Sequence, residues 1–281
     1  MTASLGAALA LLLAAAPAPP VPSPSNARQR VRWNIAPAQG APVGPPPPLT
    51  EALRLRGRSL YSRRCTACHG KDGDGRGPLA SQLDPAPAAF TRGVYKVRST
   101  PGGTLPTPQD LFQTLTRGLH GTAMRPWPEL SVRDRWALVF QLQSFSPRFA
   151  QEAPGHPLSV PIAPTETSDI LDHGEALYVR LRCGACHGES GAGDGPAREA
   201  YRRQGNRAVR IRDFTRGRFI RGREMEDIYL TLRVGVEGTP MGSYDGLPDD
   251  EIWALAAYVR ALIRQHPPGD APAATSPAPV E

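Results

Sequence analysis

The chain has only four cysteines among its 281 residues, and all four lie within two short motifs. No cysteine therefore remains for a structural disulfide. Beyond the amino terminus, no stretch approaches the roughly 18 consecutive apolar residues that a membrane-spanning helix needs. The sequence also lacks the alternation of strands and helices found in βαβ folds. Thioredoxin-like and dinucleotide-binding folds, which depend on that alternation, are thereby excluded.

The two cysteine motifs share one pattern, Cys-x-x-Cys-His. Residues 65–69 read CTACH, and residues 183–187 read CGACH. This pattern is the signature of covalent attachment of c-type haem. Two thiols about one helical turn apart can each form a thioether with a porphyrin vinyl group, and the histidine on the same helical face reaches the iron. The predicted attachment residues and proximal ligands of two haem c groups are Cys65, Cys68, His69, Cys183, Cys186 and His187.

Zinc sites and redox disulfides also use paired cysteines, but the spacing argues against both. A zinc ribbon places its second pair roughly 15–20 residues after the first, whereas the second pair here follows 118 positions later. A thioredoxin-type disulfide lies in a βαβ unit and has no need of the following histidine. The two motifs therefore favour covalent haem attachment.

The amino-terminal segment has the pattern of an export signal. Residues 5–16 read LGAALALLLAAA, which is the length of a signal-peptide core and too short for a membrane span. No Lys or Arg precedes this run, and a buried helix is the alternative interpretation. We therefore predict that residues 1–20 form a signal peptide or a short anchor. The protein is expected in the periplasm, either free or associated with the membrane through its amino terminus.

The pattern of the first half of the chain returns in the second half. The Phe-Thr-Arg-Gly sequence also occurs twice, at residues 90–93 and 214–217. Two units of this length indicate two domains from one duplicated ancestor rather than a solenoid. Pairs offset by 117 or 118 positions include Gly57 with Gly174, Tyr61 with Tyr178, Gly77 with Gly195, Met124 with Met241, and Trp136 with Trp253.

Proline-rich stretches and helical periodicity divide the chain. Thr50 suits an N-cap, Ser131 with Asp134 resembles a capping box, and Asp249 is the expected N-cap of the last helix. The expected helices run from residue 50 into the first haem motif, over 109–119 and 131–145, and from 249 to about 265. The predicted divisions are a proline-rich spacer at 21–48, domains at 49–146 and 169–266, a proline-rich linker at 147–168, and a disordered tail at 267–281.

The ligand opposite each histidine decides whether the iron passes electrons or binds a substrate. Methionine sulfur completes a six-coordinate iron and raises its reduction potential. Of the four methionines, Met1 is the initiator and Met225 has Pro108 as its repeat counterpart. Met124 and Met241 follow their histidines by 55 and 54 residues, each within Gly-Thr-x-Met. Methionine also fills gaps in cores, but the matched placement predicts that these two are axial ligands.

The remaining histidines are weaker candidates for the iron. His120 lies four residues before Met124, but its repeat counterpart is Glu237, which cannot play the same part. We therefore expect His120 at the surface or beside the ligands. The other three histidines lie in or beside the linkers and are expected to be solvated; they are His156, His173 and His266.

Each unit resembles class I cytochrome c, over residues 49–146 and 169–266. The resemblance rests on a glycine and an aromatic residue in the first helix, the haem motif, a loop with methionine, and a last helix bearing an aromatic residue. It implies small all-α domains whose first and last helices cross where glycine permits close approach. It also implies that each haem lies in an apolar crevice with one edge exposed.

Compared with the smallest members of that family, both units have a long stretch between histidine and methionine. Residues 99–107 in the first unit and 198–223 in the second are the extra segments, expected to cover the haem edge or to form a partner surface. The second segment contains ten arginines. It is either a solvated loop, a face that steers an acidic partner, or a source of cations for haem propionates. Charge reversal at Arg202, Arg203 and Arg207 would test the docking face.

The resemblance favours a dihaem cytochrome that transfers single electrons between exported redox partners, as a free carrier or as the cytochrome subunit of a respiratory complex. The net charge of +7 suits partners with acidic surfaces, and the export signal argues against nucleic acid. The alternative is a dihaem enzyme of the peroxidase or thiosulfate-oxidising type, with one open haem or a distinctive ligand such as cysteine or histidine. Because no cysteine is spare and both units offer methionine, we expect no catalytic residue. A haem-based sensor is disfavoured because no signalling domain is present.

Overall fold

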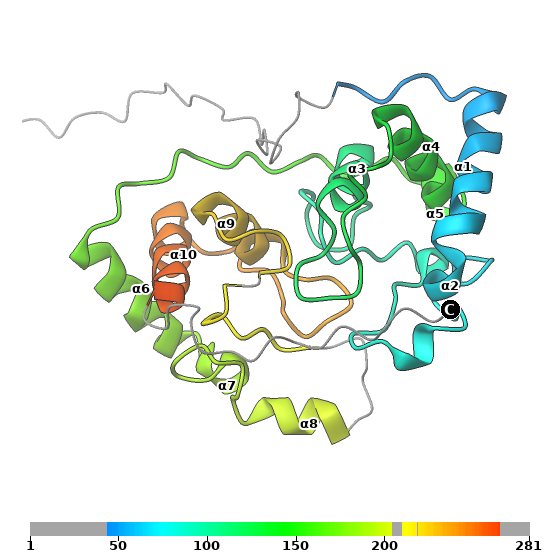
Figure 1. Ribbon diagram of the computed structural model, residues 1–281. Helices are drawn as coiled ribbons and strands as arrows, with labels where there is room; N and C mark the ends of the chain where they lie inside the picture. Colours follow the sequence, from blue (N-terminus) through cyan, green and yellow to red (C-terminus); the bar gives the residue numbers. More distant parts are fainter. Residues whose placement is uncertain (1–43, 204–209, 218, 265–281) are drawn as a thin grey trace, which may run out of the picture.

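The computed structural model describes residues 44–203, 210–217 and 219–264, and over these residues the chain contains helices and no strand. The all-α fold class expected from the sequence is confirmed. The helices form two groups that lie side by side (Figure 1). The first group consists of α1 (Glu51–Arg64), α2 (Thr66–His69), α3 (Pro108–Arg117), α4 (Val132–Gln143) and α5 (Arg148–Gln151). The second consists of α6 (Ser168–Arg180), α7 (Gly184–His187), α8 (Ala197–Arg203), α9 (Met225–Val234) and α10 (Asp249–Arg264).

Several sequence-based expectations lie outside the described residues. These are the signal segment at 1–20, most of the spacer at 21–48, the tail at 267–281, Arg207 and His266. Among the described residues, no helix is both long enough and apolar enough to cross a membrane.

The first and last helices of each group pack closely because a glycine faces the partner backbone. A Cβ atom at Gly57 in α1 would overlap the carbonyl oxygen of Ala137 in α4. In the second group, a Cβ at Gly174 in α6 would overlap the carbonyl oxygen of Ala254 in α10. The crossing expected from the resemblance is therefore present in both domains.

Each domain has its own hydrophobic core, and each core contains an aromatic pair at equivalent positions. Phe112 of α3 packs on Trp136 of α4 with ring centroids 4.6 Å apart. At the equivalent positions, Tyr229 of α9 packs on Trp253 of α10 at 4.3 Å. Both tryptophans are buried. The middle helix of each domain is thereby held against the last helix, and the loops between them line one end of the domain.

The predicted helix caps are partly confirmed. The Thr50 hydroxyl accepts a hydrogen bond from the Leu53 amide at 3.3 Å, as expected for an N-cap. Ser131 likewise accepts from the Asp134 amide at 3.1 Å. The Asp134 carboxylate does not complete a capping box, because it accepts two hydrogen bonds from Arg56 of α1 at 2.7 and 2.9 Å. This carboxylate therefore joins α4 to α1 instead of closing its own helix.

Asp249 is the first residue of α10 rather than its N-cap. Its carboxylate accepts a hydrogen bond from the Tyr229 hydroxyl at 2.6 Å and pairs with Arg233. Three further helices are absent from the sequence-based expectations: α5 in the linker, α8 in the arginine-rich segment, and α9.

The linker packs against both domains. The Leu158 amide donates to the Ser99 carbonyl at 2.8 Å, and the Gly155 amide donates to the Leu105 carbonyl at 3.0 Å. Two residues after Leu158, Val160 is buried in the core of the second domain. The linker therefore forms backbone hydrogen bonds with the extra segment at 99–107.

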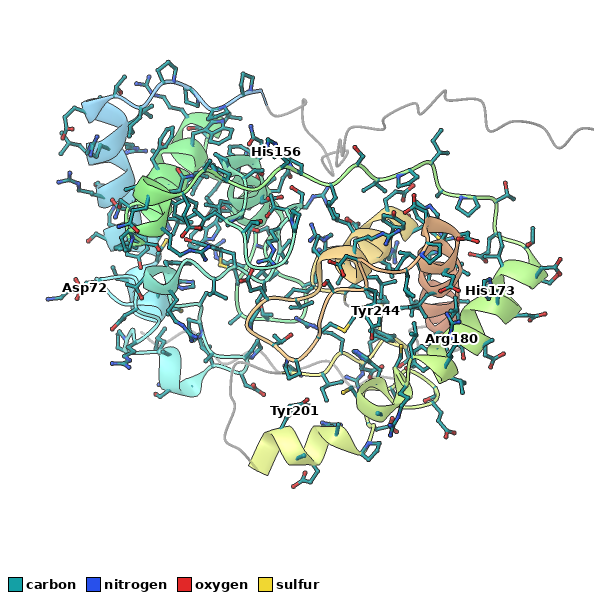
Figure 2. All side chains as sticks on the ribbon, turned by 180° about the vertical axis from the view of Figure 1, so that it is seen from behind. Asp72, His156, His173, Arg180, Tyr201 and Tyr244 are labelled. Atoms are coloured by element: carbon teal, nitrogen blue, oxygen red, sulfur yellow. The ribbon has the colours of Figure 1, made fainter. Side chains whose placement is uncertain are left out.

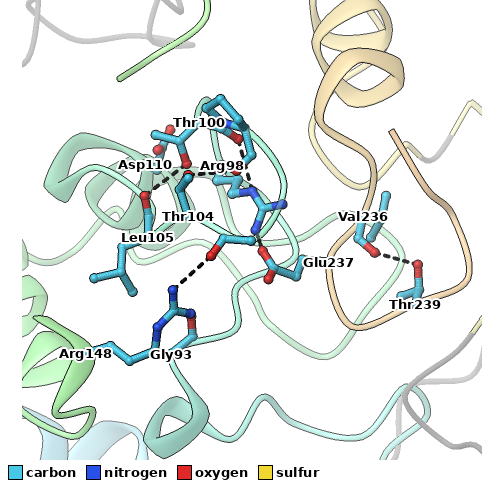
Figure 3. Close-up of polar contacts among 12 residues, drawn as sticks. Gly93, Arg98, Thr100, Thr104, Leu105, Asp110, Arg148, Val236, Glu237 and Thr239 are labelled. Atoms are coloured by element: carbon cyan, nitrogen blue, oxygen red, sulfur yellow. Dashed lines mark hydrogen bonds and ion pairs between the residues drawn. The ribbon is translucent and has the colours of Figure 1, made fainter. Parts of the chain in front are cut away.

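Buried charged side chains join the two domains (Figure 3). Arg98 of the first domain forms an ion pair with Glu237 of the second, and only 2% of Arg98 is exposed. Arg221 donates to the Arg98 carbonyl, and burial lowers the pKa of Arg221 to about 10. Burial also raises the pKa of Asp227, which lies near Arg221 and Arg117. Part of the arginine-rich segment is thus neither a solvated loop nor a docking face, because Arg221 lies inside the domain interface.

Candidate haem crevices

Hydrogen bonds and ring packing hold the first motif and its histidine in place. The Tyr61 hydroxyl donates to the Gly70 carbonyl at 2.8 Å, which ties α1 to the residue after the motif. The His69 ring stacks on Phe90 with centroids 4.5 Å apart. Its Nδ1 lies 3.1 Å from the Ala88 carbonyl, so Nδ1 carries the proton and Nε2 keeps a lone pair. Burial lowers the pKa of His69, which favours the neutral ring that a metal requires.

The second motif repeats this arrangement. The Tyr178 hydroxyl donates to the Gly188 carbonyl at 2.7 Å. His187 stacks on Phe214 at 4.3 Å, and its Nδ1 lies 3.3 Å from the Arg212 carbonyl. Burial also lowers the pKa of His187.

These contacts give a role to the repeated Phe-Thr-Arg-Gly sequence. Its phenylalanine packs on the proximal histidine in each domain, as Phe90 does on His69 and Phe214 on His187. Repetition in both units was the only available signal. The backbone carbonyls that orient the histidines cannot be predicted from the sequence, because every residue type has one.

Each Gly-Thr-x-Met segment forms a turn that fixes the methionine backbone. The Thr122 hydroxyl donates to the Leu119 carbonyl at 2.8 Å and accepts from the Met124 amide at 3.1 Å. The Met124 carbonyl then accepts from the Leu119 amide at 2.8 Å. Gly118 has φ 68°, and a Cβ there would press on the Met124 carbonyl. The turn therefore depends on the Thr122 hydroxyl and on glycine at position 118.

The second turn has the same bonds. Thr239 donates to the Val236 carbonyl at 2.6 Å and accepts from the Met241 amide at 3.2 Å. The Met241 carbonyl accepts from the Val236 amide at 2.9 Å. Two turns with the same hydrogen bonds present the two methionines in the same way.

The sequence-predicted residues of each domain meet in one cavity. In the first domain, a cavity of about 270 Å³ is lined by Cys65, Cys68, His69 and Met124. The second domain has a cavity of about 190 Å³ lined by the equivalent residues, Cys183, Cys186, His187 and Met241. Tyr244 also lines this cavity and lies inside the second domain in Figure 2.

The other described histidines line neither cavity. His120 is exposed and lines neither cavity. Figure 2 shows His156 on the connecting segment and His173 on α6, and both are exposed. Met225 lines neither cavity and is buried in the second core.

The chemistry of the first cavity fits a haem group. Its walls are largely apolar, and burial raises the pKa of the Cys65 thiol to about 12, so the site favours an uncharged sulfur such as a thioether. Two buried donors on its wall, the Trp127 Nε1 and the Tyr95 hydroxyl, have no hydrogen-bond partner within the described part of the chain. Buried polar groups rarely stay unpaired, and the haem carboxylates are acceptors.

Cationic residues line the first cavity, at Arg64, Lys96 and Arg125, and they line the second cavity as well. The lining of the second cavity includes the side chains of Arg182, Arg210 and Arg212. Arginine pairs well with carboxylates such as haem propionates. The residues of both cavities thus fit haem, with the cysteines placed for attachment and a histidine and a methionine in each.

Comparison with known proteins supports this interpretation. Residues 171–262 match the family described as cytochrome c, and residues 52–140 match cytochrome c oxidase, cbb3-type, subunit III. The chain is 29% identical over 219 residues to the thiosulfate dehydrogenase of Allochromatium vinosum. This match covers 73% of this chain and 72% of that protein.

A solved structure gives a stronger likeness. The chain is 35% identical to a chain of the Kuenenia stuttgartiensis reducing HAO-like protein complex, with a TM-score of 0.71. The match covers 76% of this chain and 97% of that one. Together with the two family matches and the paired Cys-x-x-Cys-His motifs, this likeness shows that the chain belongs to the class I c-type cytochromes, with two tandem haem-binding domains and covalently bound haem c.

Proposed function

We propose that this haem electron-transfer protein is a dihaem carrier, or the cytochrome subunit of a redox complex, in which both irons have histidine and methionine as axial ligands. One haem belongs to each domain, residues 49–146 and 169–266. The observation that carries the proposal is the pair of matching methionine turns, each opening onto the cavity that its histidine lines.

The bound haem supplies an iron that takes up and releases one electron. The chain's own residues hold its surroundings constant. Burial favours the neutral form of each histidine, a backbone carbonyl orients its ring, and phenylalanine packs on the ring. Each methionine is held by a turn with three hydrogen bonds. A site that keeps its geometry in both oxidation states suits rapid single-electron transfer.

The relatives indicate the kind of partner. The solved relative is a chain of a protein complex, which supports a role as the electron-transfer subunit beside a larger redox enzyme. The net charge of +7 favours a partner with an acidic surface. We place the protein in the periplasm, free or associated with the membrane through its amino-terminal segment.

A dihaem enzyme is the second candidate, and the relative named thiosulfate dehydrogenase favours it. Such an enzyme needs an open or distinctively ligated iron. All four cysteines belong to the attachment motifs, and each domain has a methionine in an equivalent turn. These features favour the carrier.

Methionine replacement tests the proposal. Met124→Ala and Met241→Ala should each leave one iron five-coordinate or water-bound, so that one haem per chain loses its methionine-ligated spectrum and gains carbon monoxide binding. Met225→Leu is the control, because this methionine is buried in the second core and lines neither cavity. An unchanged ferric spectrum in either alanine variant would show that the methionine is not a ligand.

A further inference from the structure

The two haem crevices share part of one wall. Pro85 and Lys96, both from the first domain, line the first cavity and also line the second. The cavities are therefore neighbours, separated at this point by side chains that belong to both. A group on this wall faces both haem sites.

The position of the shared wall is fixed from both domains. Tyr95 is buried in the first core, with its ring 6.1 Å from Phe90 and 5.9 Å from Phe149. Two residues after Lys96, Arg98 pairs with Glu237 of the second domain. The backbone on either side of Lys96 is therefore anchored, one side in each domain.

The second domain reaches back to the same wall. Arg210 donates to the Asp84 carbonyl at 3.3 Å, next to Pro85. Arg212 donates to the Gly121 carbonyl at 3.3 Å, while its own carbonyl faces the His187 ring. The loop behind the second histidine therefore touches the methionine turn of the first domain.

Lys96 is unusual in its residue type and in its surroundings. The chain has only two lysines among its 33 basic residues, and the other, Lys71, is exposed. Lys96 is half-buried; burial and the nearby Arg212 lower its pKa, while Asp84 opposes that shift. A cation in such a place is poorly screened by solvent, so its field reaches both cavities.

We propose that Lys96 sets the reduction potentials of the two haem groups together: its ammonium group, on the wall that both crevices share, raises both potentials. This inference rests on the proposed one-electron function. Reduction adds one negative charge to each haem site, and a nearby cation stabilises the reduced form. The same cation therefore acts on both sites.

The test compares three variants of the full haem-loaded chain: Lys96→Met, Lys96→Arg and Lys71→Met. Midpoint potentials of both haems are measured by absorbance during a redox titration. In Lys96→Met, the ratio of reduced to oxidised haem at fixed potential should fall about tenfold at both sites, which is about 59 mV for a one-electron couple. Lys96→Arg should restore most of the shift, and Lys71→Met should leave both potentials close to their original values.

Three results would overturn the inference. A shift at one haem alone would show that Lys96 serves a single crevice. Equal shifts in Lys96→Met and Lys96→Arg would assign the effect to packing rather than charge. No shift in Lys96→Met would remove the electrostatic role. The ferric methionine-ligated spectrum of the unaltered protein is recorded alongside, because its absence would contradict the proposed function and not the role of Lys96.

Discussion

At the scale of single residues, the methionine turns depend on a threonine two positions earlier. The Thr122 hydroxyl makes one hydrogen bond as donor and one as acceptor, and both close the same turn. Because these bonds fix the backbone at Met124, we infer that the threonine positions the proposed methionine ligand without touching the iron.

Thr122→Val keeps the shape of the side chain and removes both hydrogen bonds. We expect a partial loss of methionine ligation at the first haem and a lower reduction potential there, with the second haem unchanged. The loss of two local hydrogen bonds should lower the free energy of unfolding by about 1–2 kcal/mol. Near-infrared absorbance of the ferric protein measures the fraction of methionine-ligated haem.

Two controls sharpen this prediction. Thr239→Val should give the same effect at the second haem only, because Thr239 makes the equivalent bonds. Thr104→Val removes a hydroxyl that donates to Pro101 on the surface and should change neither haem. Equal spectra for Thr122→Val and the unaltered protein would contradict a role for the turn.

The sequence identified the residues whose chemistry is specific to haem and missed those that orient them. The cysteines and histidines of the two motifs could be predicted because Cys-x-x-Cys-His is a rare pattern with one dominant use. The acceptors for the histidine rings are the carbonyls of Ala88 and Arg212, which lie 19 and 25 residues from their histidines. Any residue type supplies a carbonyl, so only the fold could reveal them.

At the scale of helices, the crossing of α1 and α4 has little room for change. Gly57 meets the backbone of Ala137, which cannot rotate away as a side chain would. The crossing in turn fixes the haem motif, because α1 runs into it through Tyr61 and its bond to Gly70.

Gly57→Ala should therefore destabilise the protein by about 1–3 kcal/mol, the usual range for overpacking, although alanine is the better helix former. Gly174→Ala should behave in the same way in the second domain. Gly246→Ala is the control, because a Cβ there meets nothing within 4 Å. Urea denaturation followed by helical circular dichroism measures the change, and a Gly57→Ala midpoint equal to that of the control would contradict the close crossing.

Periodicity and capping located α1, α3, α4 and α10 to within a few residues. They gave no bounds for α6 and α9, and they missed the short helices. The helix expected over residues 109–119 is α3, Pro108–Arg117. The linker helix α5 has four residues, too few for any periodicity to show. It is held by Arg148, which donates to the Gly93 and Gly103 carbonyls and pairs with Glu152. Those carbonyls lie far away in the sequence.

At the scale of the whole molecule, divergence between the repeats builds the domain interface. His120 in the first unit corresponds to Glu237 in the second, and Glu237 pairs with the buried Arg98 of the first domain. Comparison of the repeats showed that this position differs, but not why. A pairing across domains leaves no local pattern, so the packed linker and the buried charges could not be predicted.

Glu237→Gln tests whether this pair holds the domains together. Removing one partner of a buried pair typically costs about 3–5 kcal/mol, and the nearby Asp110 should reduce that cost because it also acts on the Arg98 charge. We expect a lower denaturation midpoint and a larger radius of gyration by small-angle X-ray scattering. Adding Arg98→Met should recover part of the loss, because the unpaired charge is then gone. Unchanged dimensions and an unchanged midpoint in Glu237→Gln would contradict this role.

The central claim is that both irons are six-coordinate and pass electrons without binding a substrate. The most direct test is a carbon monoxide difference spectrum of the dithionite-reduced, haem-loaded protein. We predict no carbon monoxide complex at either haem, because the proposed histidine and methionine ligands leave no open position on either iron. A clear complex at one or both haems would contradict the claim, and the enzyme with an open iron would then be the better account.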